Sequence, residues 1–318
     1  MNITADVSEM VLAIRYVDRL DGASGELEVE LEDSEKLWQG PWYPALGDVV
    51  SLQIGYSGEA LLECGDFQID ELELEGPPDV MRLRCLAAYI TPAMRTANTV
   101  AYENMGILEI AAQIAAKYGL AMVVASSESE SDLMFARITQ RRQTDLEFLK
   151  RLAREHNFDF TVRAGQLIFY ERPALESVPA VAVITRSDTM RFSFRNRTRR
   201  IYDGAEFSYF DPDTKQLITQ MVSADSSSPT GDTLKIVARC ENSEQAQVKA
   251  EAALHLHNMV FVDASIEGPG TTVLVVGNNV LLSGWGALDG TYLIETALHH
   301  LARAKGYSTS IGARRISA

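Results

Sequence analysis

The chain has 318 residues, enough for about two domains at the usual size of about 150 residues each. Hydrophobic residues make up 46% of it and charged residues 23%, close to the averages of soluble globular proteins, which argues against a disordered or fibrous chain. Lysine and arginine number 29 against 44 acidic residues, and the resulting net charge of −15 argues against general adhesion to nucleic acid or to an anionic membrane.

The three cysteines, Cys64, Cys85 and Cys240, form neither an even set nor a CxxC pair. The spacing therefore indicates neither a disulfide framework nor a zinc ribbon, and we expect small, buried thiols. The first ten residues lead into no apolar segment, and no stretch approaches the roughly 18 consecutive apolar residues of a membrane span. We expect no membrane partner and synthesis in the cytoplasm with reduced thiols.

Short alternating strands dominate residues 1–95. Residues 26–32, ELEVELE, alternate strictly, which places leucine and valine on one face of a strand and glutamate on the other. Three more alternating segments follow: 48–54, 66–69 and 81–85. Because turn residues separate them, the series predicts an antiparallel barrel or sandwich, and we expect a first β-barrel here.

The hydrophobic period changes over residues 96–175. Residues 104–120, NMGILEIAAQIAAKYGL, have helical spacing and a glycine where a C′ residue would end the helix. Thr144 and Glu147 form a capping-box pattern ahead of a second helix. Residues 159–171 then predict a hairpin. We expect a small α/β insert with two helices.

Strands return over residues 176–318, where we expect a second β-barrel with one helix. The expected strands occupy 181–185, 190–194, 201–210 and 216–222. A polar loop at 224–233 and a helix at 242–258, capped by Asn242 or Ser243, come before three last strands.

Those last strands repeat the spacing of the first ones. Three sets correspond: Gly47, Val50 and Leu52 with Gly277, Val280 and Leu282; GDFQI at 65–69 with GTYLI at 290–294; and Met81, Leu83 and Cys85 with Tyr307, Thr309 and Ile311. Few identities survive, but the order and most spacings do. The pattern favours a duplicated β-domain, with strand exchange between the two barrels left open.

The sequence contains no catalytic signature. His255 and His257 are two apart on a helix and point away from each other, His299 and His300 are neighbours in a strand, and His156 ends a helix. GxSxG, HExxH, P-loop and dinucleotide motifs are absent. We expect no catalytic residue, no metal and no cofactor, and therefore a protein that is not an enzyme.

One basic cluster runs against the net charge. The segment MRFSFRNRTRR holds Arg191, Arg195, Arg197, Arg199 and Arg200. Nucleic-acid binding is one interpretation, but such a site usually lies in a basic domain. The favoured interpretation is a strand whose arginines pair with acidic faces of the same or a neighbouring subunit. Arg195, Arg197, Arg199 and Arg200 are therefore the candidate interface residues.

With these elements in order, the chain resembles the late control protein D family, the baseplate hub proteins of contractile phage tails and phage-tail-like bacteriocins. Five segments carry the resemblance: GDFQIDELELEGPPDVMRLRC, the helix after AYEN with IAAKYGL, QTDLEFLKRLAREHNFDFTVRAGQLIFYE, RRIYDGAEFSYFDP, and LDGTYLIETALHHLARAKGYSTSI. The family more often has serine where this chain has Thr144, a change that an N-cap tolerates. The match runs almost from end to end, and the last segment is the most specific.

The resemblance implies a mainly β fold with an α+β insert, in which two related antiparallel β-barrels of the hub type are present in each chain of a homotrimer. Three such chains would present six similar surfaces and join a hexameric tail tube to a trimeric central spike. The implied partners are itself, the tail tube protein, the central spike protein and other baseplate proteins. The implied location is the bacterial cytoplasm during assembly and then the baseplate of a virion or tailocin.

The resemblance implies no specific nucleic-acid partner, although DNA would pass through the channel if the particle is a phage. Glutamate faces lining that channel would let DNA slide rather than hold its phosphates. A hub-associated cell-wall hydrolase and a nucleic-acid-binding module centred on the arginine cluster are the alternatives.

Overall fold

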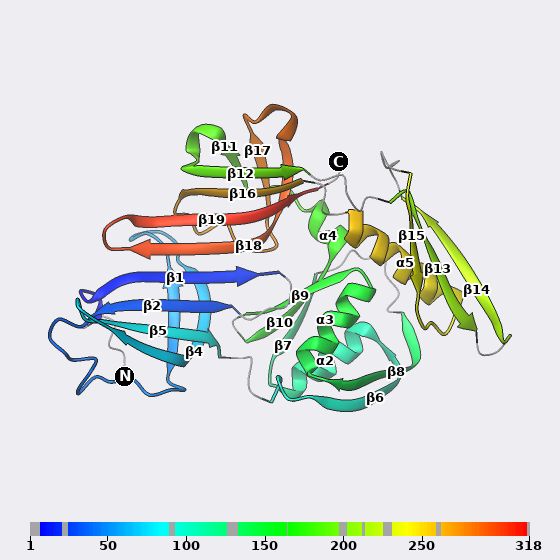
Figure 1. Ribbon diagram of the computed structural model, residues 1–318, viewed down its shortest axis with the longest axis horizontal. Helices are drawn as coiled ribbons and strands as arrows, with labels where there is room; N and C mark the ends of the chain where they lie inside the picture. Colours follow the sequence, from blue (N-terminus) through cyan, green and yellow to red (C-terminus); the bar gives the residue numbers. More distant parts are fainter. Residues whose placement is uncertain are drawn as a thin grey trace.

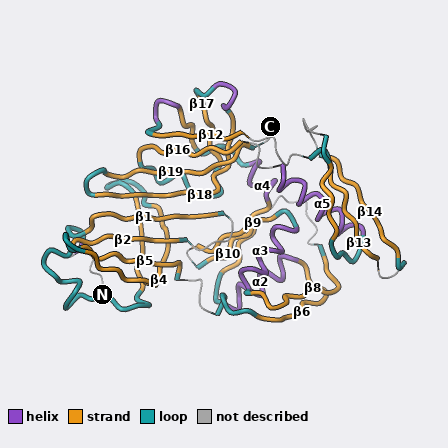
Figure 2. The backbone as a smooth tube through the Cα atoms, viewed as in Figure 1, coloured by secondary structure: helices purple, strands orange, loops and turns teal. Residues whose placement is uncertain are grey.

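The computed structural model describes residues 7–20, 25–88, 93–125, 133–163, 165–196, 202–211, 214–224, 231–258 and 262–316. The protein is mainly β with a few helices, as the sequence predicts. Figure 1 shows a large sheet on one side of the molecule, the helices α2 and α3 beside it, and a small sheet with α5 at the far side. The tube in Figure 2 shows the same division, with the long strands stacked in one layer.

The large sheet has eleven strands from both ends of the chain. Its first half consists of β1 (Val11–Arg19), β2 (Glu26–Glu32), β3 (Val49–Ile54), β4 (Leu62–Glu75) and β5 (Val80–Ala87). Its second half consists of β11 (Ala182–Thr185), β12 (Arg191–Asn196), β16 (Val262–Pro269), β17 (Asn279–Ser283), β18 (Gly290–Ala302) and β19 (Gly306–Arg315). The strand order is β12-β16-β19-β18-β1-β2-β5-β4-β3, and β17 pairs with both β18 and β11.

Among the described strands, neither half closes into a barrel, which corrects the expected pair of separate closed barrels. The physical reason lies in the length of β18. The 13 residues of this strand pair with β17 only from Gly290 to Leu293, so its remaining edge is free to take up β1. The two halves therefore join edge to edge in one open sheet.

The two halves repeat the same pairing register, which confirms the duplication. Val50 faces Phe67 in the first half, and Val280 faces Tyr292 in the second. The β4–β5 pairing is shifted by a bulge just after Ile69, and the β18–β19 pairing is shifted in the same way just after Ile294. Positions in β4 and β18 thus correspond with a constant offset.

The turn before each hairpin is also repeated. The Gly47 amide donates to the carbonyl of Ile69 over 2.8 Å, and the Gly277 amide donates to that of Ile294 over 3.0 Å. Both glycines have positive φ, +94° and +86°, a region that favours glycine. The spacing of these glycines in the sequence therefore reflects a backbone requirement.

The third pair of strands is shifted from the sequence-based correspondence. Ile69 faces Cys85 and Ile294 faces Ala313, so Leu83 corresponds to Ile311 rather than to Thr309. Spacing alone placed this pair two residues away because a shift of two keeps every side chain on the same face. Two strands of the large sheet, β1 and β16, were not predicted, and neither were β6, β7, β8 and β15 elsewhere in the chain. β1 lacks clean alternation, whereas β16 does alternate, with Val262, Ala264 and Ile266 on its buried face, so its pattern was present in the sequence but overlooked.

The insert has its own core beneath two helices. Its elements are β6 (Asn98–Gly106), α2 (Ile107–Lys117), β7 (Ala121–Ala125), β8 (Met134–Gln143), α3 (Asp145–Glu155), β9 (Phe158–Arg163) and β10 (Gln166–Glu171), and α4 (Arg172–Ser177) follows. The capping box is confirmed, because the Glu147 amide donates to Thr144 Oγ1 over 3.1 Å and the Thr144 amide to Glu147 Oε2 over 2.9 Å. β9 and β10 form the expected hairpin, and β7 adds to it in parallel.

A smaller body lies between β12 and β16 in the sequence. It consists of β13 (Gly204–Asp211), β14 (Gln216–Ser223), β15 (Thr233–Val237) and α5 (Ser243–Asn258). Phe207, Ala246 and Ala250 are central to its own core, separate from that of the second half. Asn242 caps α5, since its Oδ1 accepts from the Gln245 amide over 2.9 Å. None of the described helices has the length and apolar character that crossing a bilayer needs.

The sequence boundaries at 95/96 and 175/176 stay predictions. Four separate hydrophobic cores exist among the described residues, one in each half of the large sheet, one in the insert and one in the body carrying α5. Most of the expected loop at 224–233 lies outside the described residues.

Candidate assembly interface

The pairing of β1 with β18 joins the two halves, and we call it the internal seam. Ala13 faces Ala302 at one end of this antiparallel pairing and Arg19 faces Thr296 at the other. Backbone bonds extend it at both ends, from the Arg303 amide to the Leu12 carbonyl and from the Leu20 amide to the Glu295 carbonyl, each over 2.9 Å. The seam is therefore a continuous ladder of backbone hydrogen bonds between distant parts of the chain.

Aromatic side chains pack tightly at the centre of the internal seam. Tyr16 stacks on His299, with ring centroids 5.9 Å apart, and meets the edge of Phe67 at 5.7 Å. His299 Nδ1 lies 2.8 Å from the Tyr307 hydroxyl. Only 1% of His299 is exposed, and this burial lowers its pKa from 6.5 to about 4, so the imidazole is neutral near pH 7.

Ion pairs hold the rim of the internal seam. Arg303 Nη1 lies 2.7 Å from Glu32 Oε2, and the same guanidinium holds the pKa of Glu32 below its usual value. Asp18 contacts Arg163 of the insert at 3.4 Å, yet burial raises the pKa of Asp18. The seam is thus tied to β2 and to the insert.

Charges alternate from strand to strand on the polar face of the first half. Arg82 on β5 reaches Glu30 on β2 at 3.1 Å and Glu73 on β4 at 2.9 Å, with Glu28 and Glu75 at 3.2 and 3.5 Å. These carboxylates raise the pKa of the Arg82 guanidinium further above its ordinary value. The glutamate rows anticipated as an acidic surface are therefore partly neutralised by an arginine row between them.

Of the four candidate interface arginines, only Arg195 falls within the described residues; Arg197, Arg199 and Arg200 lie outside them. Arg195 is exposed and sits on β12 opposite Asp263 of β16. β12 pairs with β16 and forms one end of the sheet as far as the described strands go.

Apolar side chains accompany the arginines on β12. Phe192 and Phe194 pack against Trp285 at ring-centroid distances of 5.8 and 5.5 Å. Phe192 is nevertheless 39% exposed, and Met190 just before the strand is 66% exposed. This edge thus combines positive charge with uncovered apolar surface, which is typical of a protein contact.

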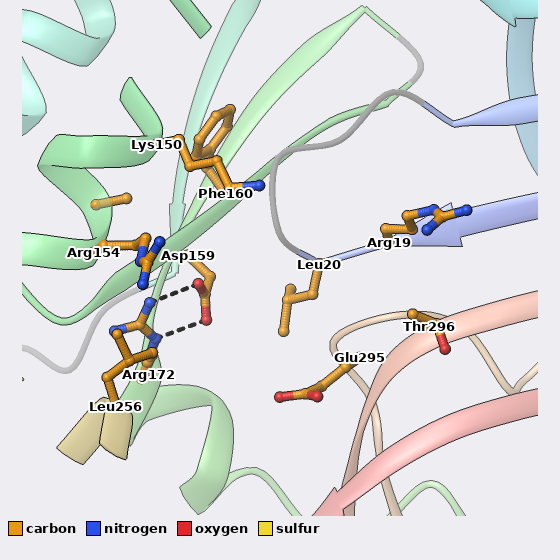
Figure 3. A pocket seen from close by; sticks show the side chains of 11 residues that line it. Arg19, Leu20, Lys150, Arg154, Asp159, Phe160, Arg172, Leu256, Glu295 and Thr296 are labelled. Carbon is orange, nitrogen blue, oxygen red and sulfur yellow. Dashed lines mark hydrogen bonds and ion pairs between the residues drawn. The ribbon is translucent and has the colours of Figure 1, made fainter. Parts of the chain in front are cut away.

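A cavity of about 420 Å³ lies where the insert, α5 and the seam meet. Figure 3 shows Arg172 forming two bonds to Asp159, both of 2.8 Å, with Glu295 across the space. Glu295 contacts Arg314 at 2.8 Å. Because both carboxylates that line the cavity are paired with arginines, we interpret it as a joint between bodies rather than as a reaction centre.

The described residues contain no group of three His, Cys, Asp or Glu side chains placed to hold a metal ion. His156 follows α3 as its C-cap, as predicted, and its burial lowers its pKa to about 4. Cys64, Cys85 and Cys240 are buried free thiols. Sequence reasoning missed the internal seam and the Arg82 ladder, although the segments ELEVELE, DELELE and MRLRC carried the signal for the latter.

The chain is similar to known phage proteins. It is 28% identical over 207 residues to the probable baseplate hub protein of Escherichia phage 186, covering 64% of this chain and 52% of that protein. The probable baseplate hub protein of Escherichia phage P2 is 28% identical over 208 residues, with the same shares. The chain thus spans about half the length of the curated relatives it matches. No protein-family model matches it.

Solved structures share the fold. A tail protein from Neisseria meningitidis has a TM-score of 0.74 at 14% identity, covering 96% of this chain and 92% of that one. The 43 kDa tail protein of prophage MuSo2 from Shewanella oneidensis has a TM-score of 0.69 at 16% identity, with 96% and 94% covered. An E. coli component of the type VI secretion system has a TM-score of 0.60 at 15% identity, with 97% and 74% covered.

Proposed function

Since the chain belongs to the family of phage baseplate hub proteins, related in fold to phage tail proteins and a type VI secretion component, we propose that it is the structural hub of a contractile tail's baseplate. In this proposal three chains form a ring that joins the hexameric tail tube to the trimeric central spike. The role is structural and not enzymatic. Its place is the baseplate of the finished particle.

One observation carries this proposal: the chain contains the same strand arrangement twice. Gly47, Val50 and Phe67 recur as Gly277, Val280 and Tyr292 with the same pairings and the same turn bond. A threefold assembly of such chains presents six similar sheet halves and so can match a sixfold tube. Because the side chains differ between the two halves of each chain, only three of the six surfaces are identical to one another, and these three can match a threefold spike.

Partners of the hub would approach from both ends of the ring. The tube protein would meet the six similar halves, and the spike and other baseplate proteins would meet surfaces that differ between the halves. The net charge of −15 keeps such a ring soluble before it is incorporated. In a phage, DNA would pass through the ring without specific contacts.

Light scattering with the full chain tests this proposal. Three chains of 35.1 kDa predict a particle of about 105 kDa, alone or with the purified spike protein. A particle visible as a ring in micrographs and bound to the spike is the expected result. A chain that stays monomeric and ignores both spike and tube, or that clears a peptidoglycan suspension, would contradict the proposal.

A further inference from the structure

The strand β12 occupies the same place in the second half as β1 does in the first. Tyr16 of β1 faces Leu27 of β2, and Phe194 of β12 faces Ala264 of β16. The equivalence follows from the register, because β2 pairs with β5 as β16 pairs with β19. The outer edge of β1 is covered by β18, whereas within the described residues the outer edge of β12 meets no strand.

The part of β18 that pairs with β1 in the internal seam also has an equivalent in the first half, on β4. β1 pairs with residues 296–302 of β18, just beyond the bulge, and the same distance beyond the bulge of β4 lie residues 71–75. β3 covers β4 only from Leu62 to Gln68, so among the described strands residues 71–75 pair on one side alone. His299 is 1% exposed under β1, while the equivalent Leu74 is 47% exposed.

We propose that β12 of one copy pairs antiparallel with residues 71–75 of β4 in a second copy, in the register of the internal seam. Val17 faces Leu298 and Tyr16 faces His299 there, so Arg195 faces Glu73 and Phe194 faces Leu74 across the new seam. We call it the external seam. The inference deepens the proposed function, on whose self-assembly it rests.

Charge on the polar face fits this register. Rows of acid, base and acid succeed each other on β4, β5 and β2, as the bonds of Arg82 show. At the other end Asp263 and Glu267 of β16 face Arg195 and Arg191 of β12. An acidic row beside β12 continues the alternation, and opposite charges on facing positions stabilise paired strands. Glu73 already contacts Arg82 at 2.9 Å and Arg84 at 3.5 Å, and its two carboxylate oxygens keep acceptor capacity for a further arginine.

The other face of the two edges is apolar. Phe192 and Leu74 are 39% and 47% exposed, large side chains that a neighbouring strand would cover. An exposed edge carries unpaired backbone groups that readily take up another strand, so each of these two edges is able to pair with a partner strand. Here one edge is basic and the other acidic, which favours pairing unlike edges over like ones.

The arrangement also closes on itself. Each copy has one β12 edge and one β4 edge, so the contact is head to tail and forms a ring when the rotation fits. In a trimer, three internal and three external seams alternate around the ring. All six sheet halves are then joined by the same backbone ladder.

Disulfide cross-linking of the full chain tests the register. Arg195→Cys and Glu73→Cys are made in separate chains, mixed, oxidised mildly and run on a non-reducing gel. Facing residues of paired strands bring their Cα atoms to about 5 Å, within disulfide range. We expect a cross-linked dimer in the mixture, and a covalent trimer when one chain carries both changes. Arg191→Cys with Glu73→Cys is the matched control, displaced by four residues, about 13 Å along the strand, and should not cross-link.

The outcomes separate the two proposals. If light scattering finds the trimer but the Arg195/Glu73 pair does not cross-link, or the Arg191 control cross-links as well, the external seam is wrong and the hub proposal stands. A monomer at every concentration, with the spike protein present, overturns both. Cross-linking of the expected pair alone supports the seam.

A charge exchange measures the same contact without oxidation. Arg195→Glu places an acid against the acidic edge and should weaken trimer association by about tenfold or more, as should Glu73→Arg. The chain carrying both changes should recover most of the loss. Arg141→Glu, the same charge change on exposed β8 of the insert, is the control and should leave association unchanged. Failure of the double variant to recover, with both single variants folded, would overturn the facing pair.

Discussion

The two halves of the large sheet share a backbone plan but differ in what covers their edges. In the second half the edge of β18 is paired with β1, and the positions along this edge include Ala297 and His299, both buried. In the first half the equivalent positions on β4 carry Leu72 and Leu74, and their neighbours are Glu71, Glu73 and Glu75. The comparison teaches that the two halves keep the same pairing register, while their side chains differ according to whether the strand edge is covered by another strand or left open.

The largest expected effect comes from removing the aromatic side chain at the centre of each half's core. Phe67 and Tyr292 occupy the same register position, with 1% and 0% exposure. Phe67→Ala and Tyr292→Ala should each lower the free energy of unfolding by about 3 to 5 kcal/mol, through lost burial and a cavity. Urea denaturation measures the loss. Tyr292→Phe, which removes only the 2.7 Å bond to the Leu288 carbonyl, should cost about 1 kcal/mol. A cost below that of Tyr292→Phe at either position would contradict the equivalence.

The second effect distinguishes the halves by pH, because His299 titrates and Leu74 does not. The unfolded imidazole binds its proton near pH 6.5, but the buried one does so only near pH 4. The unfolded chain therefore binds more protons between these values, and stability falls as the pH falls from 6.5 towards 4, by at most about 3 kcal/mol from this group.

Denaturation of the wild type and of His299→Leu at pH 7, 5.5 and 4 measures this contribution. The difference between the two curves matters, since the buried Asp18, whose pKa is raised, acts in the opposite direction. The variant should lose less stability on acidification than the wild type. Parallel pH curves would show that His299 is not held neutral by the seam.

A smaller effect tests the repeated turn. Gly47→Ala and Gly277→Ala put a side chain at positive φ, where the nearest atoms leave room at 3.7 and 3.9 Å. The cost is therefore conformational, about 1 to 2 kcal/mol, and should be similar in both halves. Gly25→Ala, at a residue without positive φ and with its nearest atom at 3.6 Å, should change thermal unfolding little. Unequal costs at the two turns would weaken the comparison.

The smallest effect concerns the ladder that only the first half has. Arg82 contacts four glutamates, and the equivalent position in the second half is Ser310. Arg82→Met should cost about 0.5 to 1 kcal/mol at low salt, because ion pairs on a surface that water reaches contribute little even when the arginine is partly buried. The more exposed Arg84, with two such contacts, should cost less when changed to Met. Both costs should shrink at about 1 M salt. If the loss of stability at high salt equals that at low salt, the arginines stabilise the sheet by packing and not by their charge.

Local patterns predicted much of the molecule. The Thr144 capping box, the helix ending before Gly119 and the alternation of ELEVELE each depend on neighbours in the chain, and all three are confirmed. The duplication was also visible, because Gly47 and Gly277 meet the same backbone requirement. Of the candidate interface, the sequence identified the basic strand with Arg195 but not the acidic edge that we propose as its partner.

The sequence by itself determined many of the strands and the main helices, and that the first and last strands are copies. Only the tertiary structure decided that β1, while pairing with β2 of its own half, also pairs with β18, and that, among the described strands, β4 and β12 keep open edges. The physical reason is that edges pair through backbone amides and carbonyls, which every residue carries alike. Which edge meets which is therefore fixed by strand lengths and by the positions of bulges in the assembled sheet, and not by the side-chain pattern of either strand.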